Sequence, residues 1–461
     1  MAVADFSPGI APRTPVQGAP GRARLDACPG ALQTHPAADG AVARIRVPGG
    51  ILTTAQLREL GATATCLGSG VIELTSRANV QVRGLDAQGE TVFAGRMAGA
   101  GLLPSATHER VRNILASPMA GLDGLGLIEV APLVRELDDA LCARPALAEL
   151  PGRFLFALDD GRGDLLALVP DIAFIPIPAP AGGEAVEGAL LLAGEDHGRR
   201  VALTRAVPAM TAAAEAFLAE RAAQNSTAWR VAELDDGPTR IAARLSTFDD
   251  VTRPGHVEGS DGTESFGHVA PVPDFSEMSI PPPLGRISRP GKRTALVVMP
   301  PLGRLTTAQA YALATAAEAG GGEIRLTPWR AAVVPGISEA DAGSWLSGLA
   351  ATGLVTDPAS AWTGVTACTG RPGCAKSLAD VQADATRSTA RAALPLIDAP
   401  RAGVLPVHWA GCERRCGRPA GRAVLVVATG DGYRVDADGR SLHHKDIEET
   451  ATSVATARTT G

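Results

Sequence analysis

Four cysteines near the end of the chain form two closely spaced pairs. Cys368 and Cys374 have five residues between them, Cys412 and Cys416 have three, and 37 residues separate the pairs. Zinc-binding cysteine pairs usually keep two to four residues between them, so the first pair fits zinc poorly. Four thiolates suit an iron–sulfur cluster, and a disulfide framework is the alternative. The pattern therefore predicts a four-thiolate metal centre.

Basic residues lie beside both cysteine pairs. A thiolate cluster carries negative charge, and cations close to it moderate that charge. Glycines in the first pair let the backbone approach a bulky centre. The four arginines concerned are Arg371, Arg414, Arg415 and Arg418.

A second group of polar residues follows a strand-like alternation at positions 71–84. With a period of two, five polar side chains share one face, and apolar residues occupy the other face. This pattern predicts one continuous strand with a face built for hydrogen bonding to a ligand; a solvated edge strand is the alternative. The five residues are Thr75, Arg77, Asn79, Gln81 and Arg83.

Part of the sequence occurs twice, about 250 residues apart. The word Leu52-Thr-Thr-Ala-Gln56 returns as Leu305-Thr-Thr-Ala-Gln309, and each copy is followed by a strand-like segment and a glycine. Such self-similarity indicates an internal duplication. The second copy lacks the polar face, because Trp329, Ala331, Val333 and Pro335 replace its residues. We therefore expect a duplicated fold with one working site.

Composition excludes several classes of function. The net charge is −6 and aromatic residues make up 3% of the chain, which gives nucleic-acid binding little support. No apolar run approaches the ~20 residues needed to cross a bilayer, and no signal peptide is read, so we expect a cytoplasmic protein. Only three of the 43 basic residues are lysines. A GC-rich genome explains this bias, and arginine also suits carboxylate recognition.

The cysteine spacings together with the duplicated unit resemble the sirohaem nitrite/sulfite reductase superfamily. The word Thr75-x-Arg77-x-Asn79-x-Gln81 is similar to that superfamily's strand contacting sirohaem carboxylates, and Arg112-Asn113 is similar to its second arginine region. The resemblance implies that the four cysteines hold a [4Fe–4S] cluster. It also implies that Cys416 is the thiolate that, in the reductases, bridges to the sirohaem iron.

One departure from the sulfite reductases concerns proton supply. Those enzymes carry paired lysines after a Leu-Pro, whereas the corresponding stretch here, Leu150–Leu155, has Arg153 and Leu155 in their place. A six-electron reduction consumes many protons, so the loss of these donors counts against sulfite or nitrite as substrate.

The chain most resembles the precorrin-3B synthase branch of the superfamily, through Cys28-Pro29-Gly30, Asp39-Gly40 and the strand ending at Gly84. The resemblance implies O2-dependent hydroxylation of precorrin-3A at C20 and closure of a γ-lactone, in aerobic cobalamin biosynthesis. It implies a [4Fe–4S] cluster, a further iron centre (non-haem iron or sirohaem) and NADH as ultimate reductant. We expect Arg77 and Arg112 to be catalytic. The residues expected to grip the tetrapyrrole are Thr75, Arg77, Asn79, Gln81, Arg83, Arg112, Asn113 and Arg153.

The resemblance also implies an α+β fold, with ferredoxin-like half-domains and iron–sulfur/tetrapyrrole-binding α/β domains. We expect an irregular arm (1–40), ferredoxin-like repeat 1 (41–110), a first α/β domain (111–245), a linker (246–293), repeat 2 (294–356), an iron–sulfur-binding α/β domain (357–445) and a tail (446–461).

The sequence gives less direct information about a second iron and about the electron donor. Ligands of a second iron have no motif, and His108 and His408 are candidates by position only, each better explained as structural. Cys66 and Cys142 fall in expected helices and are interpreted as core thiols. No dinucleotide-binding glycine motif follows a strand, so electrons would come from an external donor protein. The alternatives are a sirohaem-dependent assimilatory nitrite or sulfite reductase, and a non-catalytic iron–sulfur electron carrier.

Overall fold

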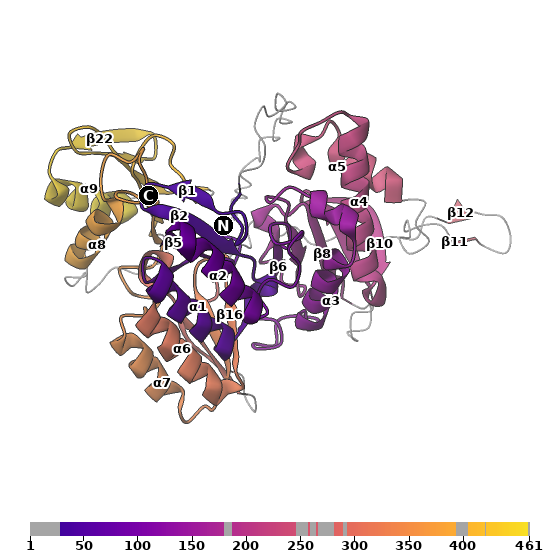
Figure 1. The fold of residues 1–461 in the computed structure, drawn as a ribbon, viewed down its shortest axis with the longest axis horizontal. Helices are drawn as coiled ribbons and strands as arrows, with labels where there is room; N and C mark the ends of the chain where they lie inside the picture. The colour runs from indigo at the N-terminus through magenta and orange to yellow at the C-terminus, as the bar shows by residue number, and fades with distance from the viewer. Residues whose placement is uncertain are drawn as a thin grey trace, which may run out of the picture.

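The computed structural model describes residues 28–178, 187–245, 257–258, 264–265, 281–288, 293–392, 404–419 and 421–459. Most of the expected N-terminal arm and of the expected linker therefore lies outside the described residues. Two α/β domains flank a central pair of ferredoxin-like halves, whose helices α1, α2, α6 and α7 gather together (Figure 1).

Repeat 1 forms an antiparallel sheet covered by two helices. Helix α1 starts at a capping box. The Thr53 hydroxyl accepts a hydrogen bond from the Gln56 N–H, and the side-chain oxygen of Gln56 accepts one from the Thr53 N–H, so two helix-terminal donors are satisfied. The elements are β1 (His35–Ala37), β2 (Gly40–Ile45), β3 (Ile51–Thr53), α1 (Thr54–Leu67), β4 (Val71–Leu74), β5 (Val80–Leu85) and α2 (Ala87–Gly99).

Repeat 2 follows the same plan. Its first helix begins with the same capping box, made by Thr306 and Gln309, so the repeated word in the sequence is the helix start. The elements are β13 (Gly285–Ile287), β14 (Thr294–Val298), β15 (Arg304–Thr306), α6 (Thr307–Gly320), β16 (Glu323–Leu326), β17 (Ala332–Ile337) and α7 (Ala342–Ala351). The predicted duplication is confirmed, with β1 and β13 beginning each copy earlier than expected.

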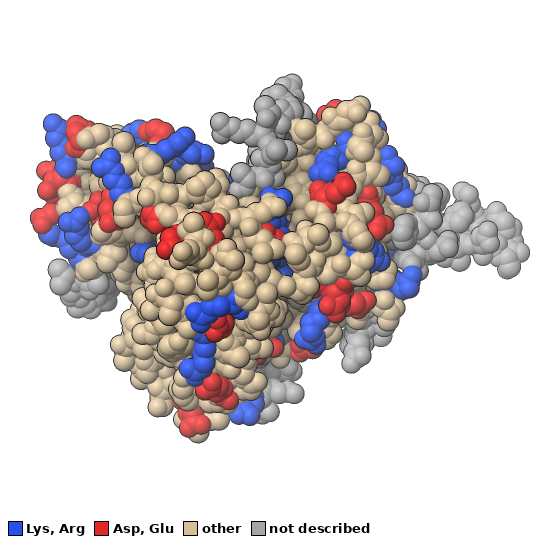
Figure 2. Space-filling view, viewed as in Figure 1, with Lys and Arg blue, Asp and Glu red and all other residues tan. Residues whose placement is uncertain are grey.

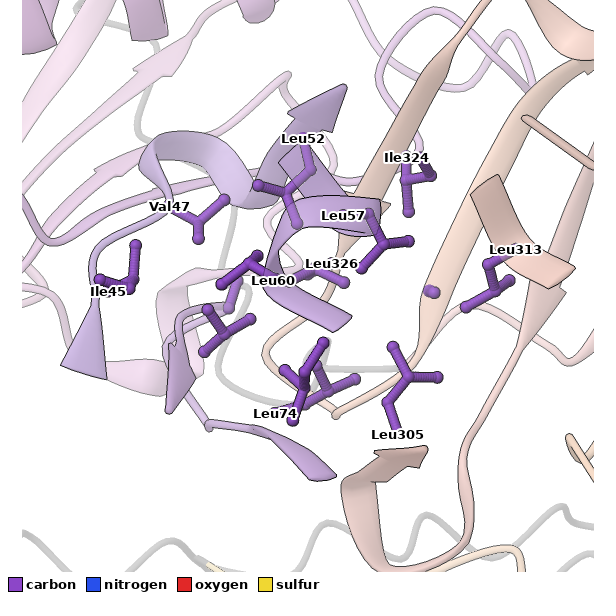
Figure 3. Close-up of a cluster of buried hydrophobic side chains, with 14 of the residues drawn as sticks. Ile45, Val47, Leu52, Leu57, Leu60, Leu74, Leu305, Leu313, Ile324 and Leu326 are labelled. Carbon is purple, nitrogen blue, oxygen red and sulfur yellow. The ribbon is translucent and has the colours of Figure 1, made fainter. Parts of the chain in front are cut away.

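The two repeats exchange one strand each. The first sheet runs β1-β2-β5-β4-β15 and the second β13-β14-β17-β16-β3. Strand β15 therefore pairs with β4, and β3 pairs with β16, each across the repeat boundary. Apolar side chains from both copies meet in one buried cluster, in which Leu52 and Leu57 lie with Leu305, Leu313 and Ile324 (Figure 3).

The expected single strand over 71–84 is wrong. Strand β4 ends at Leu74 and β5 begins at Val80, and the chain reverses between them, with the Thr75 N–H donating to the Asn79 carbonyl at 2.9 Å. Ala78 adopts a φ of 54° in this turn, a left-handed conformation that no regular strand contains. Arg77 consequently projects from a turn, and only Gln81 and Arg83 of the five polar residues lie on a strand.

The first α/β domain has three parallel strands followed by two antiparallel strands, in the order β6-β7-β8-β9-β10. Phe154, Phe156 and Phe217 pack within its core. The elements are β6 (Ile114–Ala116), α3 (Ala131–Cys142), β7 (Phe156–Leu158), β8 (Ile172–Pro176), β9 (Glu187–Leu192), β10 (Glu195–Ala202), α4 (Ala206–Ala223) and α5 (Gly237–Arg244).

The C-terminal domain repeats this topology. Strands β18-β19-β20 are parallel and β20-β21-β22 antiparallel, so the duplication extends through the α/β domains as well. Residues expected to form a tail are instead helix α9, which packs on β21. The elements are β18 (Val365–Ala367), α8 (Val381–Ala392), β19 (Val407–Ala410), β20 (Val424–Ala428), β21 (Tyr433–Ala437), β22 (Arg440–His444) and α9 (Ile447–Thr459).

Candidate functional site

The four cysteines lie at one edge of the C-terminal sheet. Cys368 directly follows β18, and Cys412 follows β19 after one residue. Because β18 and β19 are parallel, their carboxyl ends reach the same edge, and both cysteine loops begin there. The topology thus brings together two pairs that are distant in sequence.

Backbone hydrogen bonds tie the two loops to each other. The Gly411 N–H donates to the Cys368 sulfur at 3.1 Å, and the Leu378 N–H donates to the Gly411 carbonyl at 2.8 Å. Gly411 has no room for a side chain, since a Cβ there would lie 1.9 Å from the Ser377 hydroxyl. The N–H bond to sulfur is the kind of donor that stabilises a cluster-bound thiolate.

The electrostatics show that the thiols lie near one another. Burial raises the pKa of Cys368, and the neighbouring Cys374 and Cys416 raise it further, while N–H groups of Gly411 and Gly370 oppose the rise. Without a bound cation, burial above all keeps the Cys368 thiol protonated. Cations held at this place would stabilise the thiolates.

Four thiolates are the donor set of an iron–sulfur cluster. Over the described ranges, no group of three or more His, Cys, Asp or Glu side chains is arranged to hold one metal ion. In a [4Fe–4S] cluster each thiolate binds a different iron, so the four sulfurs stand farther apart than the ligands of one ion. Cys368, Cys374, Cys412 and Cys416 would hold such a cluster.

A second concentration of charge lies between repeat 1 and the first α/β domain. Arg46 is 1% exposed and donates to the Arg110 carbonyl at 3.1 Å and the Pro29 carbonyl at 3.3 Å. Within the described part of the chain, its Nη2 atom is buried and has no hydrogen-bond partner. Burial, then the charge of Arg44, lowers the pKa of Arg46 to about 9. Arg46 was missed in the sequence, and only its place directly before Val47-Pro48 at the end of β2 distinguishes it.

Arg77 belongs to the same group. Its guanidinium donates to the Gly152 carbonyl at 3.4 Å. Burial, followed by the charge of Arg230, lowers its pKa to about 10, with Arg153 acting in the same direction. Cys28 lies within electrostatic reach of both Arg46 and Arg77. Cationic groups that are buried with few counter-charges are suited to an anionic ligand.

Several predicted tetrapyrrole ligands have partners within the protein. Arg112 is 3% exposed and binds both carboxylate oxygens of Asp138 at 2.6 Å. Asn79 donates to Asn113 at 3.0 Å and accepts from the Val47 N–H at 2.8 Å. These residues join repeat 1 to the first α/β domain, and the structure does not bring Arg112 into the cationic group around Arg77.

The remaining predicted ligands are distributed differently. The Thr75 hydroxyl caps the turn by accepting the Asn79 N–H at 3.1 Å. Gln81 accepts from Arg44 at 2.8 Å on the face of the first sheet. Arg153 is exposed and stacks on the Trp229 ring, 5.2 Å from its centroid. Arg83 points to the cysteine loop instead of the cationic group.

The histidines considered as metal ligands are structural. The ring nitrogens of His108 contact Ser105 at 2.9 Å and the Arg144 carbonyl at 3.0 Å. His408 is fully buried, its two nitrogens contacting Thr366 and the Cys416 carbonyl. Neither ring has a nitrogen left for iron.

Cys66 is exposed and Cys142 half-buried, so the interpretation of both as core thiols is wrong for Cys66.

The visible surface gives no sign of a nucleic-acid interface. Figure 2 shows Lys and Arg interspersed with Asp and Glu over this face, without a continuous basic stripe. No helix in the described part of the chain is long and apolar enough to cross a membrane.

Comparisons with known proteins agree with the duplicated architecture. The family described as "Nitrite/Sulfite reductase ferredoxin-like half domain" matches twice, at residues 35–89 and 286–352. The chain is 29% identical to a ferredoxin–nitrite reductase of Synechococcus elongatus, covering 88% of this chain and 79% of the relative. It is 27% identical to a precorrin-3B synthase of a Sinorhizobium species, covering 90% and 83%.

Among solved structures, the Mycobacterium tuberculosis NirA protein superposes with a TM-score of 0.68 at 22% identity, covering 90% of this chain and 79% of that one. Two segments of the chain thus match the ferredoxin-like half domain of nitrite/sulfite reductases, the fold is that of the NirA protein, and the predicted duplicated architecture is confirmed. Relatives of similar identity bear the names of reductases and of a synthase, so the particular reaction depends on the site itself.

Proposed function

We propose that this protein is a precorrin-3B synthase that hydroxylates precorrin-3A at C20 and closes the γ-lactone with O2 as oxidant. One oxygen atom enters the macrocycle and the other leaves as water, with two electrons supplied ultimately by NADH. The resemblance to the precorrin-3B synthase branch and the 27% identity to a protein of that name support the proposal.

The single observation that carries the proposal is the chemistry at positions 153 and 155. Where sulfite reductases carry lysines, Arg153 is stacked on Trp229 and Leu155 is a 3% exposed core residue. Neither side chain replaces a lysine as a proton donor, because a guanidinium holds its protons far more firmly than an ammonium group and leucine carries no ionisable group. These side chains would therefore supply protons poorly to a six-electron reduction, which consumes many of them. A two-electron oxygenation consumes fewer protons.

The arginines would bind the substrate. A precorrin is edged with carboxylates, and a guanidinium binds a carboxylate through two parallel hydrogen bonds. Arg46 and Arg77 have pKa values of about 9 and 10, so both stay charged at pH 7. Arg46 also offers a buried donor without a partner, which a substrate carboxylate would satisfy. Their burial keeps water away from these pairs and strengthens them.

The cysteine loops would hold the [4Fe–4S] cluster, which when bound supplies electrons singly. Their surroundings also favour a protein donor. A surface hollow of 490 Å³ beside Cys412 is lined by Lys376, Arg414, the 45% exposed Leu378 and Glu413. The Glu413 carboxylate is neutralised by Arg434 at 2.6 Å. Two cations around an exposed apolar residue suit an acidic electron carrier, because complementary charge accelerates encounter.

The second candidate is a sirohaem-dependent, ferredoxin-linked nitrite or sulfite reductase. The 29% identity to the Synechococcus elongatus ferredoxin–nitrite reductase over 88% of this chain favours it. In that enzyme type, Cys416 would bridge the cluster and the sirohaem iron, and the cationic group around Arg46 would bind the inorganic anion.

One experiment separates the two candidates. The protein is purified anaerobically, its absorption spectrum is recorded, and it is assayed with precorrin-3A, O2 and a reductant, and separately with nitrite or sulfite and reduced methyl viologen. We expect a broad cluster absorption and turnover of precorrin-3A that stops without O2. A sirohaem Soret band with reduction of nitrite or sulfite would overturn the proposal in favour of the second candidate.

A further inference from the structure

Arg83 forms a bridge between repeat 1 and the cysteine loop. From β5 its Nη2 atom donates to the Gly373 carbonyl at 2.7 Å, and the same guanidinium binds Asp39 through bonds of 2.8 and 3.1 Å. Gly373 directly precedes Cys374. The bridge joins residues 290 positions apart, so it is a contact between separate domains.

The geometry around the bridge is tightly specified. Arg83 is 9% exposed, and a Cβ at Gly373 would lie 2.9 Å from an Asp39 oxygen and 2.7 Å from Thr369. Asp39 sits in the β1–β2 turn, where Gly40 has a φ of 113° and approaches Gly84 so closely that a Cβ on Gly40 would lie 2.8 Å from the Gly84 carbonyl carbon. The Asp39-Gly40 pair noted in the sequence therefore forms this turn, in which Gly40 permits the close approach to Gly84 and Asp39 binds Arg83.

These contacts turn Arg83 toward the cysteine loop. Three of the five N–H donors of its guanidinium bind Asp39 and Gly373, and the two on Nη1 remain. The bridge fixes the peptide group before Cys374, a position from which charge acts on any centre the cysteine holds.

We propose that Arg83 and Asp39 form a charge clamp that positions the Cys368–Cys374 loop and sets the reduction potential of the cluster held there. This inference rests on the proposed cluster but not on the identity of the substrate. Reduction adds one negative charge to a cluster. A cation near it favours the reduced form and an anion disfavours it, so the two members of the clamp act in opposite directions.

The opposite signs give a test. Arg83→Met removes the cation and leaves Asp39 unpaired, so we expect the ratio of reduced to oxidised cluster, at the wild-type midpoint, to fall about tenfold, equivalent to ~59 mV for a one-electron couple. Asp39→Asn should raise the same ratio. The double variant should return toward the wild type. Redox titration of the anaerobic protein followed by electron paramagnetic resonance gives these values without any substrate.

Controls separate the clamp from simple damage. Arg96→Met removes one member of an ion pair with Glu59 in the same half-domain, and should leave the potential unchanged. If Arg83→Met fails to retain its cluster, Arg83→Lys keeps the charge and should stay within about twofold of the wild-type ratio. Iron content and thermal unfolding are measured for every variant.

Three outcomes decide the matter. Opposite shifts for the two single variants support the clamp. Equal shifts in the same direction, or none in variants that keep their iron, overturn it while leaving the proposed cluster intact. A wild-type protein that holds no cluster after anaerobic reconstitution overturns the proposed cluster and the clamp together.

Discussion

Replacing Arg46 with methionine should weaken ligand binding at little cost in stability. Burial lowers the pKa of Arg46 to about 9, far below the ordinary value for arginine. At about 1.36 kcal/mol per pKa unit, the buried charge costs roughly 4 to 5 kcal/mol. Methionine removes this cost and retains much of the packing. It also removes two hydrogen bonds, to Arg110 and Pro29, worth about 1.5–3 kcal/mol each because the donor is charged.

The two contributions nearly cancel, so the unfolding free energy should change by no more than about 2 kcal/mol. The desolvation cost is present in full at pH 7, since this pH lies below both the folded and the unfolded pKa of Arg46. The assay is urea denaturation of the protein without ligand. Binding of precorrin-3A, followed by an absorbance titration, should weaken ~10- to 100-fold, because a hydrogen bond to a charged group contributes about 1.5–3 kcal/mol.

Arg112→Met provides the matched comparison. Arg112 is equally buried but is paired with Asp138, so its removal leaves a carboxylate without its cation and should destabilise the protein by ~3–5 kcal/mol. If Arg46→Met also loses stability and binds precorrin-3A as tightly as the wild type, Arg46 is a structural residue and the binding role is refuted.

Three further results are expected. Burial, followed by the charge of Asp159, raises the pKa of Asp164 to about 8, so the folded protein holds a proton that the unfolded chain releases near pH 4 and stability falls as pH rises from 4 to 8. Burial also raises the pKa of Asp171 to about 6, so Asp164→Asn should reduce this fall in urea titrations without abolishing it, and the variant should be a few kcal/mol more stable than the wild type at pH 8. Cys416→Ser should lose most of its iron and visible absorption, whereas Cys66→Ser should keep both; iron retained in full by the Cys416 variant would contradict the ligand set. Arg414→Glu should raise the KM for the electron donor about tenfold at low salt and less at high salt, with Arg422→Glu as the control for charge reversal elsewhere on the domain.

Much of the architecture could be predicted from local sequence signals. The repeated Thr-Thr-Ala-Gln word marks two helix starts because a capping box depends on residues only three positions apart. The duplication of the α/β domains was not predicted from the sequence. The two domains share the order and direction of their strands, but no repeated stretch of sequence marks them.

The candidate site was predictable only in part. Alternation placed Arg77 on a strand, but a turn closed by Thr75 and Asn79 overrides it. Sequence cannot show that Arg112 is neutralised by Asp138, because that pairing depends on the packing of α3. Arg46 escaped notice for the opposite reason: a lone arginine on a strand gains meaning only when its burial and its unpartnered nitrogen are seen.

The exchange of β3 and β15 between the two sheets has a consequence for how the chain arose and how it folds. Each half lends an edge strand to the other, so a lone half would expose an open sheet edge and lack its own final strand. Two copies of such a half would complete each other as a symmetric strand-swapped dimer, and the present chain has the arrangement that a fused dimer of this kind would have. The ferredoxin-like centre therefore needs residues 35–99 and 285–351 together. In fragments split at the expected linker, its two sheets should be completed only when the fragments are mixed.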